Sequence, residues 1–511
     1  MAATKHVPDI IEVISDLSND EVRTPPKVAN QVLDLLPKEV WNNAEYRWLD
    51  PGSKSGVFLR EATKRLMVGL ADRIPDEQDR LRHILKNQMF GVCITELSSM
   101  MSRRALYCSK DASGEQSIVT MDSPMGNLWH DRVSHPFKNE RCTECGAGQD
   151  KFGSLRGENH AYAFIHENGR KAVEEVIEMK FDVIVGNPPY QIDADAAGQN
   201  VNPIYDRFVE QSIAMAPRFI SMIIPARWMA GGKGLDGFRE RILSSKNFSQ
   251  LVDYPNPKEI FPQVEIKGGV AYFLWDSQHQ GPCSFTSVRQ GISRGPQARN
   301  LSEFDVFIRD DRALPILRKV MRSNTSSRWL SAVITTRDPF GPALSSNLRD
   351  HRSDKSRRTG DLKCYMVSFG KRVAVWIDPA KVSRNEHLID CWKVFLPKAG
   401  SDGGQKIPDI VIGAPLIGEP GSVSTMTFLA AGPLASNSAA ESFESYMKSR
   451  FVRFLISLRK ISQNTTSGVY GWVPLQDWDR TWTDAELYKM YAITPEEQEY
   501  IAEMVKEMPA K

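Results

Sequence analysis

The segment Phe181–Gln191, FDVIVGNPPYQ, places an amide, two prolines and a tyrosine directly after a run of apolar residues. Because the rings of Pro188 and Pro189 restrict the backbone, the Pro188 carbonyl can be held beside the side-chain oxygen of Asn187. Two acceptors held together suit an amino group that carries two hydrogens, and the ring of Tyr190 offers a face on which a base can stack. The alternative is an ordinary proline-rich turn at a strand end. The segment therefore predicts a site that binds and orients an amine.

A second group of residues, with metal-binding chemistry, lies between residues 123 and 180. Cys142 and Cys145 form a C-x2-C turn, and four of the nine histidines flank it, namely His130, His135, His160 and His166. Two thiolates and two imidazoles can complete a closed tetrahedral zinc site, which would order an insert with little core of its own. The sequence predicts Cys142, Cys145, His160 and His166 as the ligands. The alternative is a turn with unpaired thiols and surface histidines.

Six apolar runs predict the strands that position these residues. They are YRWLDPGS, Asn87–Glu96, the run SIVTMD that ends at Asp122, FDVIVG, Phe219–Ala226 and Gly268–Asp276. Segments with helical spacing, such as KVANQVLDLL and PIYDRFVEQSIAMA, lie between some of the runs. Apolar strands that alternate with helices predict an α/β fold with a mostly parallel sheet covered on both faces. Ligand sites in such sheets lie at the carboxyl ends of strands, where NPPY is expected.

Five motifs between residues 20 and 276 resemble those of the γ-class N6-adenine DNA methyltransferases of restriction–modification systems, and they occur in the same order. They are VRTPPKVANQVLDLL, LDPGSKSGVFLREATKRL, MDSPMGNLW, FDVIVGNPPY and GGVAYFLWD. The resemblance implies a Rossmann-like sheet that binds S-adenosylmethionine (SAM), followed by a C-terminal mixed α/β target-recognition domain. One departure is Lys54, which stands where the first loop glycine of the family usually falls, while Gly52 and Gly56 remain.

The resemblance also implies roles for individual residues. The catalytic set would be Asn187, Pro188, Pro189 and Tyr190. The set that contacts SAM would be Thr24, Pro25, Asp50, Gly52, Gly56, Phe58, Glu96, Asp122 and Asn187. In that set, Asp50 would contact the methionine amino group, Glu96 the ribose hydroxyls and Asp122 the adenine amino group of SAM. The alternative for Glu96 and Asp122 is a solvated acid at a strand end.

The implied reaction is direct transfer of a methyl group from SAM to N6 of an adenine that is flipped out of double-stranded DNA. Two alternatives stay open. Asp253, Glu265 and Lys267 superficially resemble the D…ExK pattern of a nuclease, which would make the chain a methyltransferase–nuclease fusion. NPPY also occurs in methyltransferases that act on RNA or on protein glutamine, because each of these substrates presents an amino nitrogen to the same acceptors.

The length of 511 residues predicts more than one domain. We predict a catalytic domain over 1–280 with the insert at 123–180, a target-recognition domain over 281–445 and a C-terminal helical segment over 446–511. Because the net charge is only +2, a nucleic-acid surface must be a local patch. The predicted patch is a basic stretch that comprises Arg349, Arg352, Lys355, Arg357 and Arg358. The alternative is a solvated loop with no partner role.

The remaining expectations concern packing, partners and location. Three tryptophans near the C-terminus are predicted to pack in a core, namely Trp472, Trp478 and Trp482. Besides DNA, the restriction–modification resemblance implies a cognate restriction endonuclease as a partner. No run approaches 18 uninterrupted apolar residues and the N-terminus lacks the pattern of a signal peptide, so we expect no membrane span. The scattered cysteines predict a cytoplasmic protein.

Overall fold

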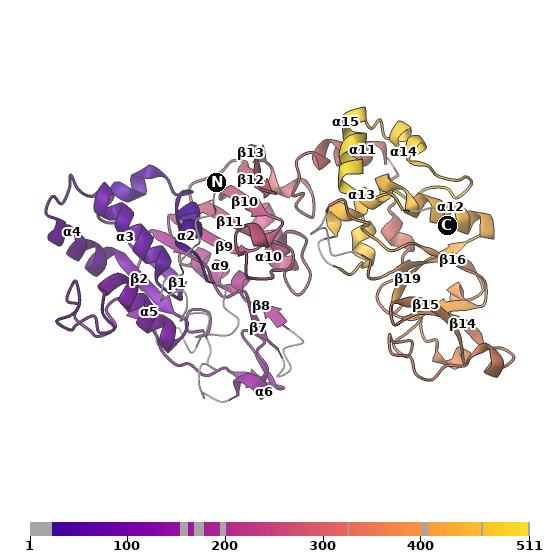
Figure 1. Cartoon of the computed structure of the whole chain (residues 1–511), viewed down its shortest axis with the longest axis horizontal. Coiled ribbons are helices and arrows are strands. Elements are labelled where there is room, and N and C mark those ends of the chain that lie inside the picture. Colours follow the sequence, from indigo (N-terminus) through magenta and orange to yellow (C-terminus); the bar gives the residue numbers. More distant parts are fainter. Residues whose placement is uncertain are drawn as a thin grey trace, which may run out of the picture. The chain divides into compact units, whose positions relative to one another are not determined.

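The computed structural model describes residues 23–153, 162–167, 178–194, 201–324, 326–400, 407–460 and 463–508. The chain divides into two compact units, Met1–Phe307 and Ile308–Lys511 (Figure 1). The predicted boundary near residue 280 is wrong, because residues 283–299 form two more strands of the sheet in unit 1. The predicted helical segment 446–511 is also not separate, since it clusters with the rest of unit 2.

Unit 1 is built around a nine-stranded sheet. Its strands are β1 (Trp48–Ser53), β2 (Met89–Cys93), β3 (Leu128–Trp129), β6 (Val183–Gly186), β9 (Phe219–Pro225), β10 (Phe248–Tyr254), β11 (Val270–Asp276), β12 (Cys283–Arg289) and β13 (Ile292–Arg299). Their order in the sheet is β13-β12-β10-β11-β9-β6-β1-β2-β3. The strands from β3 to β9 pair in parallel, whereas β11 runs antiparallel between β9 and β10. Because β1 and β6 are parallel neighbours, the residues that follow them meet at one edge of the sheet.

Helices pack on both faces of this sheet. The helices of unit 1 are α2 (Pro26–Leu33), α3 (Val57–Gly69), α4 (Glu77–His83), α5 (Glu96–Tyr107), α6 (Gln149–Phe152), α9 (Tyr205–Ala214) and α10 (Asp236–Ser244). Successive strand residues point to opposite faces. Trp48 and Val183 lie in one core with residues of α2, α3 and α5, while Leu49 and Ile184 lie in a second core with residues of α9 and α10. The predicted α/β fold with a Rossmann-like sheet is confirmed.

One predicted strand, SIVTMD ending at Asp122, is wrong. Its backbone bonds to the segment after α5, because Ile118 N donates to the Tyr107 carbonyl at 2.9 Å and Met121 N donates to the Ala112 carbonyl at 2.9 Å. The place beside β2 is taken by β3, in which Leu128 pairs with Gly91. The other five apolar runs do contain strands of the sheet, namely β1, β2, β6, β9 and β11.

Two small hairpins lie outside the main sheet and belong to the region around NPPY. One pairs β4 (Phe137–Lys138) with β5 (Arg141–Cys142), within the insert. The other pairs β7 (Gln191–Asp193) with β8 (Val201–Pro203), and β7 begins at the residue that follows Tyr190. Strands of two or three residues are too short to show an apolar run, so the sequence did not predict them.

Unit 2 contains two three-stranded sheets and a set of helices, which confirms the predicted mixed α/β character. One sheet has the order β15 (Lys371–Ile377), β14 (Leu362–Ser368), β18 (Ser422–Ser424), and the other β17 (Leu416–Gly418), β16 (Trp392–Pro397), β19 (Phe428–Leu434). The helices are α11 (Ala313–Ser323), α12 (Asn437–Lys448), α13 (Arg450–Arg459), α14 (Asp484–Met490) and α15 (Pro495–Met504).

The predicted packing of the C-terminal tryptophans is confirmed. Trp472 and Trp482 are buried. The Trp478 ring lies 4.7 Å from that of Phe443 and 5.7 Å from that of Tyr446, measured between centroids. Within the described ranges, no helix combines the length and the apolar character that crossing a membrane would require.

Candidate active site

The loop between β1 and α3 forms the base of the site. Asp50 is buried near the end of β1, and its Oδ1 accepts a hydrogen bond of 3.2 Å from the backbone N–H of Gly52. Gly56 ends the loop with a φ of +68°, a conformation that side-chain-bearing residues rarely adopt, and α3 starts at the next residue. This turn directs the N-terminus of α3 toward the end of the strand.

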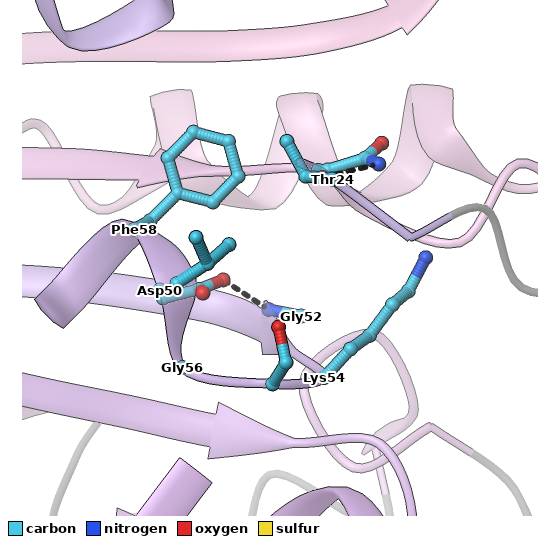
Figure 2. Close-up of a pocket in the computed structure, with 9 residues that line it drawn as sticks. Thr24, Asp50, Gly52, Lys54, Gly56 and Phe58 are labelled. Atoms are coloured by element: carbon cyan, nitrogen blue, oxygen red, sulfur yellow. Dashed lines mark hydrogen bonds between the residues drawn. The ribbon is translucent and has the colours of Figure 1, made fainter. Parts of the chain in front are cut away.

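The loop lines a small, open pocket. Figure 2 shows Thr24, Asp50 and Phe58 around one hollow, with Lys54 rising from the loop. The lining residues are Thr24, Asp50, Gly52, Lys54, Ser55, Gly56, Val57, Phe58 and Asn187. Six of the residues expected to contact SAM are therefore brought together at one pocket, namely Thr24, Asp50, Gly52, Gly56, Phe58 and Asn187.

Two glycines allow the ends of β1 and β6 to pack tightly. A Cβ atom on Gly52 would lie 3.3 Å from Pro188 Cα and 3.4 Å from Pro189 Cδ, so the loop lies against NPPY. A Cβ atom on Gly186 would lie 2.7 Å from Oδ1 of Asp50, closer than such atoms approach in folded proteins. Gly186 was not predicted as a site residue, because its close approach to Asp50 arises only from the pairing of β1 with β6.

Asn187 connects the NPPY segment to the N-terminal motif. Its side chain is buried, and its Nδ2 donates a hydrogen bond of 2.9 Å to Oγ1 of Thr24, which is 163 positions earlier in the sequence. Pro25 does not line the pocket but caps α2, where its carbonyl accepts from the backbone N–H groups of Val28 at 2.9 Å and Ala29 at 3.0 Å. The N-terminal motif thus holds the amide of Asn187 from one side.

Burial changes the acid–base behaviour of Asp50. Loss of hydration raises the pKa of this carboxyl from 3.8 to about 7, against smaller lowering effects from the Gly52 N–H, Ser53 and Lys54. A carboxylate in such a place is costly unless a cation lies nearby. The pocket is therefore suited to a ligand that brings a positive charge to Asp50.

Tyr190 lies at the far end of NPPY. Burial raises the pKa of its hydroxyl well above the ordinary value for tyrosine, so the group stays protonated at neutral pH. The ammonium of Lys54 lies 6.0 Å from the centroid of the Tyr190 ring. Lys54, the residue that departs from the family's glycine pattern, therefore lies both at the pocket and beside the predicted base-stacking ring.

The two acids predicted to bind the cofactor do not line the pocket. Glu96 is the first residue of α5, its side chain is 55% exposed, and Arg132 Nη2 lies 2.7 Å from its Oε2. Asp122 has a 98% exposed side chain that lies 3.4 Å from Lys86 Nζ. Because the strand expected before Asp122 is absent, the first acid after the observed strand β3 is Asp131. The cofactor roles of Glu96 and Asp122 stay predictions.

The insert brings together four buried side chains that could hold a metal ion, namely His135, Cys142, Cys145 and His166. Three of them are predicted ligands, but His135 stands in place of the predicted His160. His160 lies outside the described residues. The signal for His135 was weak, since it precedes Cys142 by seven positions and only the folded hairpin turns it toward Cys145.

The predicted basic stretch packs on the β14–β15 hairpin. Arg352 forms a two-way backbone bridge with Trp376 and an ion pair with Asp361, so its side chain is engaged within unit 2. The Arg357 guanidinium lies 3.8 Å from the centroid of the Trp376 ring. The other predicted cations are exposed: Arg349, Lys355 and Arg358.

An apolar side chain stands at the tip of the same hairpin. Phe369 is fully exposed, and its φ of +46° is unusual for a bulky residue. Lys371, the second residue after it, is also exposed.

The residues of the nuclease-like pattern do not form a metal site. Asp253 is fully buried within β10, whereas Glu265 and Lys267 are exposed in the loop before β11. In the part of the chain that the structure describes, the group of potential metal ligands is the one around Cys142 and Cys145.

Two comparisons of sequence relate the chain to known methylases. A family model described as Eco57I restriction-modification methylase matches residues 87–261. A Mycoplasma pneumoniae protein named as an uncharacterized adenine-specific methylase is 35% identical over 300 residues, which are 53% of this chain and 71% of that protein.

Solved structures of DNA complexes also align with the chain. The structure of a DrdV–DNA complex aligns with a TM-score of 0.49 and 10% identity over 95% of this chain and 57% of that chain. The type IIL restriction-modification enzyme MmeI in complex with DNA aligns with a TM-score of 0.44 and 11% identity over 86% of this chain and 62% of that chain. This chain thus spans less than two thirds of either of those chains. On the M. pneumoniae relative, of which 71% is covered at 35% identity, the chain belongs to the adenine-specific methylases.

Proposed function

We propose that this chain is a site-specific DNA adenine methyltransferase that transfers a methyl group from SAM to N6 of a flipped-out adenine. The observation that carries the proposal is the hydrogen bond from Nδ2 of Asn187 to Oγ1 of Thr24. It orients the amide of the predicted catalytic motif at the pocket that Asp50 and Gly52 line. Direct methyl transfer depends mainly on aligning the amine with the donor, and an oriented amide contributes to that alignment.

The residues of the pocket fit SAM as the methyl donor. Asp50 offers a buried carboxylate to the amino group of the methionine part, which carries the positive charge that burial calls for. Gly56 lets the backbone turn close to the ligand, and Phe58 gives an apolar wall. When bound, SAM supplies an electrophilic methyl group on a sulfonium.

The NPPY residues would hold the adenine. In a duplex, N6 cannot approach the donor in line, so the base must leave the stack. Asn187 Oδ1 and the Pro188 carbonyl would accept the two N6 hydrogens, which leaves the nitrogen lone pair directed at the methyl group. The ring of Tyr190 would stack on the base.

Replacement of Asn187 tests the assigned role. Asn187→Ala is expected to lower methylation turnover by about 100-fold or more, because it removes a preorganised polar contact to the reacting group. Asn187→Asp keeps an acceptor and can still pair with the Thr24 hydroxyl, so it should retain more activity than the alanine variant. Calorimetry should find SAM binding by both variants, since Asp50 and the glycine loop are intact.

The substrate is identified by sequencing that detects N6-methyladenine in DNA from cells expressing the wild type or Asn187→Ala. The expected result is methylated adenines in one common sequence with the wild type and their absence with the variant. Near-wild-type methylation by Asn187→Ala would contradict the role of Asn187. Incorporation of labelled methyl groups into RNA or protein, and not into DNA, would contradict the substrate.

We also propose that the basic stretch and the β14–β15 hairpin of unit 2 contact DNA. The stacking of Arg357 on Trp376 fixes part of the basic stretch to the hairpin, which supports one continuous surface. Exposed cations neutralise phosphates, while an exposed aromatic side chain such as Phe369 suits contact with bases.

A variant in which Arg349, Lys355 and Arg358 are replaced by glutamine tests this surface, because it leaves the anchored residues Arg352 and Arg357 in place. The DNA dissociation constant should rise, and the slope of log affinity against log salt should fall by about one for each phosphate that the variant no longer neutralises. The matched control replaces Lys64, Arg73 and Arg82, which are exposed on unit 1.

Phe369→Ser separates base contact from phosphate contact on this surface. It is expected to weaken DNA binding with an unchanged salt slope, because an apolar contact releases no counterions. Wild-type affinity and slope in both the charge variant and Phe369→Ser would overturn the proposed interface.

For the insert, we propose a structural zinc ion. Its support is the approach of four buried ligand atoms to within 4.8 Å of one another. A set of two sulfur and two nitrogen ligands with no open position is typical of structural zinc.

A further inference from the structure

The four side chains of the cluster converge on one point: Cys142 and Cys145 come from one turn, and His135 and His166 from segments before and after it. Sγ of Cys142 lies 3.7 Å from Nε2 of His166, and Sγ of Cys145 lies 3.4 Å from Nδ1 of His135. All four residues are buried. Ordinary packing can place one histidine against one thiol, but it gives no reason for two such pairs to meet at the same point.

The backbone around the cluster presets the ligands. The Gly146 N–H donates to the Cys142 carbonyl at 3.0 Å, which closes the turn between the two cysteines, and Gly146 has a φ of +76°. His166 Nδ1 donates to the Tyr162 carbonyl at 2.8 Å, which leaves its Nε2 as the nitrogen facing Cys142. A metal-ligating histidine commonly makes such a bond through its other nitrogen.

The cluster is tied directly to the hairpin that continues NPPY. The Gly148 N–H donates to the Asp193 carbonyl at 3.2 Å, and Lys151 forms an ion pair with the Asp193 carboxylate. On the other strand, Nδ2 of Asn202 donates to the Gly146 carbonyl at 3.2 Å. Both β7 and β8 are therefore bonded to the segment that carries the two cysteines.

A second line of contacts leads from the cluster to the glycine loop. The rings of Tyr162 and Phe164 lie 6.0 Å and 5.7 Å from that of Phe208, measured between centroids. Phe208 Cε1 would lie 3.8 Å from a Cβ atom on Gly52. The segment with His166 thus packs, through one aromatic ring, against the loop that lines the pocket.

We propose that a metal ion held by His135, Cys142, Cys145 and His166 fixes the β7–β8 hairpin, and through it the NPPY segment, in the position that the transferred methyl group requires. This inference rests on the proposed methyl transfer. The Ile204 N–H donates to the Tyr190 carbonyl at 3.2 Å, so the same hairpin also holds the last residue of NPPY. These four residues are positioning residues, since they act on the substrate through the hairpin.

The first experiment measures metal content in the full-length protein, independently of methylation. Elemental analysis is expected to find one zinc per chain in the wild type, and far less in His135→Ala and Cys145→Ser. Cys108→Ser and His351→Ala, which change an exposed thiol and an exposed imidazole, are matched controls that should keep the metal. Replacement of zinc by Co²⁺ should add thiolate-to-cobalt charge-transfer absorption, which both ligand variants should lack.

The second experiment separates positioning from folding in the wild-type protein. Removal of zinc by a chelator is expected to increase amide hydrogen exchange most in β7 and β8, and less in the loop from Asp50 to Phe58, which the cluster reaches through one aromatic ring. SAM binding should be retained. Turnover should fall by about 100-fold, because small misplacement of a reacting group is costly, and added zinc should restore it. If His160→Ala loses the metal and His135→Ala keeps it, the ligand set is wrong.

Unchanged exchange in both strands after complete zinc removal would overturn the positioning role. Metal content and hydrogen exchange are measured without a methylation assay. The test of the metal therefore remains valid even if the enzyme modifies a substrate other than DNA. Loss of methylation in Asn187→Ala, together with full methylation by the zinc-free wild type, would support the function and overturn the role of the metal.

Discussion

Two regions are assembled in opposite ways: the pocket lined by Asp50 and Asn187, in which we propose that SAM binds, and the cluster of histidines and cysteines in the insert. In the pocket, Thr24 and Asn187 are hydrogen-bonded although they are 163 positions apart in sequence. The sheet at whose end Asn187 lies has long strands that are fully buried, such as β1 and β9. The cluster draws on residues 135–166, where β4 and β5 have two residues each. A continuous sheet with long strands therefore positions the pocket, whereas the four ligand side chains meet in an insert whose own strands are short.

This difference predicts which perturbations each region tolerates. A region held by close packing is sensitive to added volume, because neighbouring backbones have no space to move. A region that is ordered by a metal ion is sensitive to ligand loss and chelation, because binding of the ion contributes to its folding free energy. The two regions meet at NPPY, so both kinds of change should reach the catalytic step.

A sharp test of close packing is one added methyl group in the pocket. In Gly186→Ala the new Cβ would lie 2.7 Å from Oδ1 of Asp50, so either the carboxylate or β6 must shift. SAM affinity and turnover should each fall by about tenfold or more, while zinc content stays at the wild-type level. Calorimetry with SAM and elemental analysis check the two parts.

Gly237→Ala is the matched control, because the added Cβ would meet only the end of the Arg241 side chain, at 3.5 Å. It should leave both regions unchanged. If Gly186→Ala binds SAM as tightly as the wild type, close packing does not hold the pocket, and the contrast with the insert fails.

A graded effect on SAM affinity is expected from pH. With the pKa of Asp50 raised to about 7 by burial, this carboxyl is mostly protonated at pH 5 in the free protein. Because the amino group of SAM favours the carboxylate, affinity should rise by up to about tenfold per pH unit below pH 7 and level off above it. Titration calorimetry at several pH values measures this slope, and Asp50→Asn should abolish it.

The raised pKa of Asp50 also predicts how the stability of the folded protein changes with pH. Between pH 4 and 7 the unfolded chain has lost the Asp50 proton while the folded chain keeps it, so ligand-free stability should fall as pH rises through this range. SAM should reverse part of that loss. If the affinity for SAM does not change with pH, the positively charged amino group of SAM does not bind next to Asp50.

Much of unit 1 follows from local patterns in the sequence. The apolar runs that contain β1 and β6 are bounded by glycine or proline, so they identify the strands whose ends form the pocket. The run SIVTMD is similarly apolar but bonds to the segment after α5, and periodicity does not reveal hydrogen-bond partners. β10, FSQLVDY, was not predicted because polar residues interrupt its apolar pattern.

The candidate site was predictable where a short motif fixes the geometry, as for Asn187 after β6 and Gly56 before α3. It was not predictable where tertiary contacts decide. His135 joins the cluster only through the β4–β5 hairpin, and Gly186 matters only because β1 and β6 are neighbours. Glu96 and Asp122 were assigned by order along the chain, yet both side chains lie away from the pocket lining.

Every residue that lines the donor pocket, and all four residues of the cluster, lie within unit 1. Genes that recombine near the codon for Phe307 would pass on this half whole, together with its chemistry. If unit 2 contacts DNA as proposed, a lineage could change that contact by replacing the second half, without rebuilding the proposed methyl-transfer site.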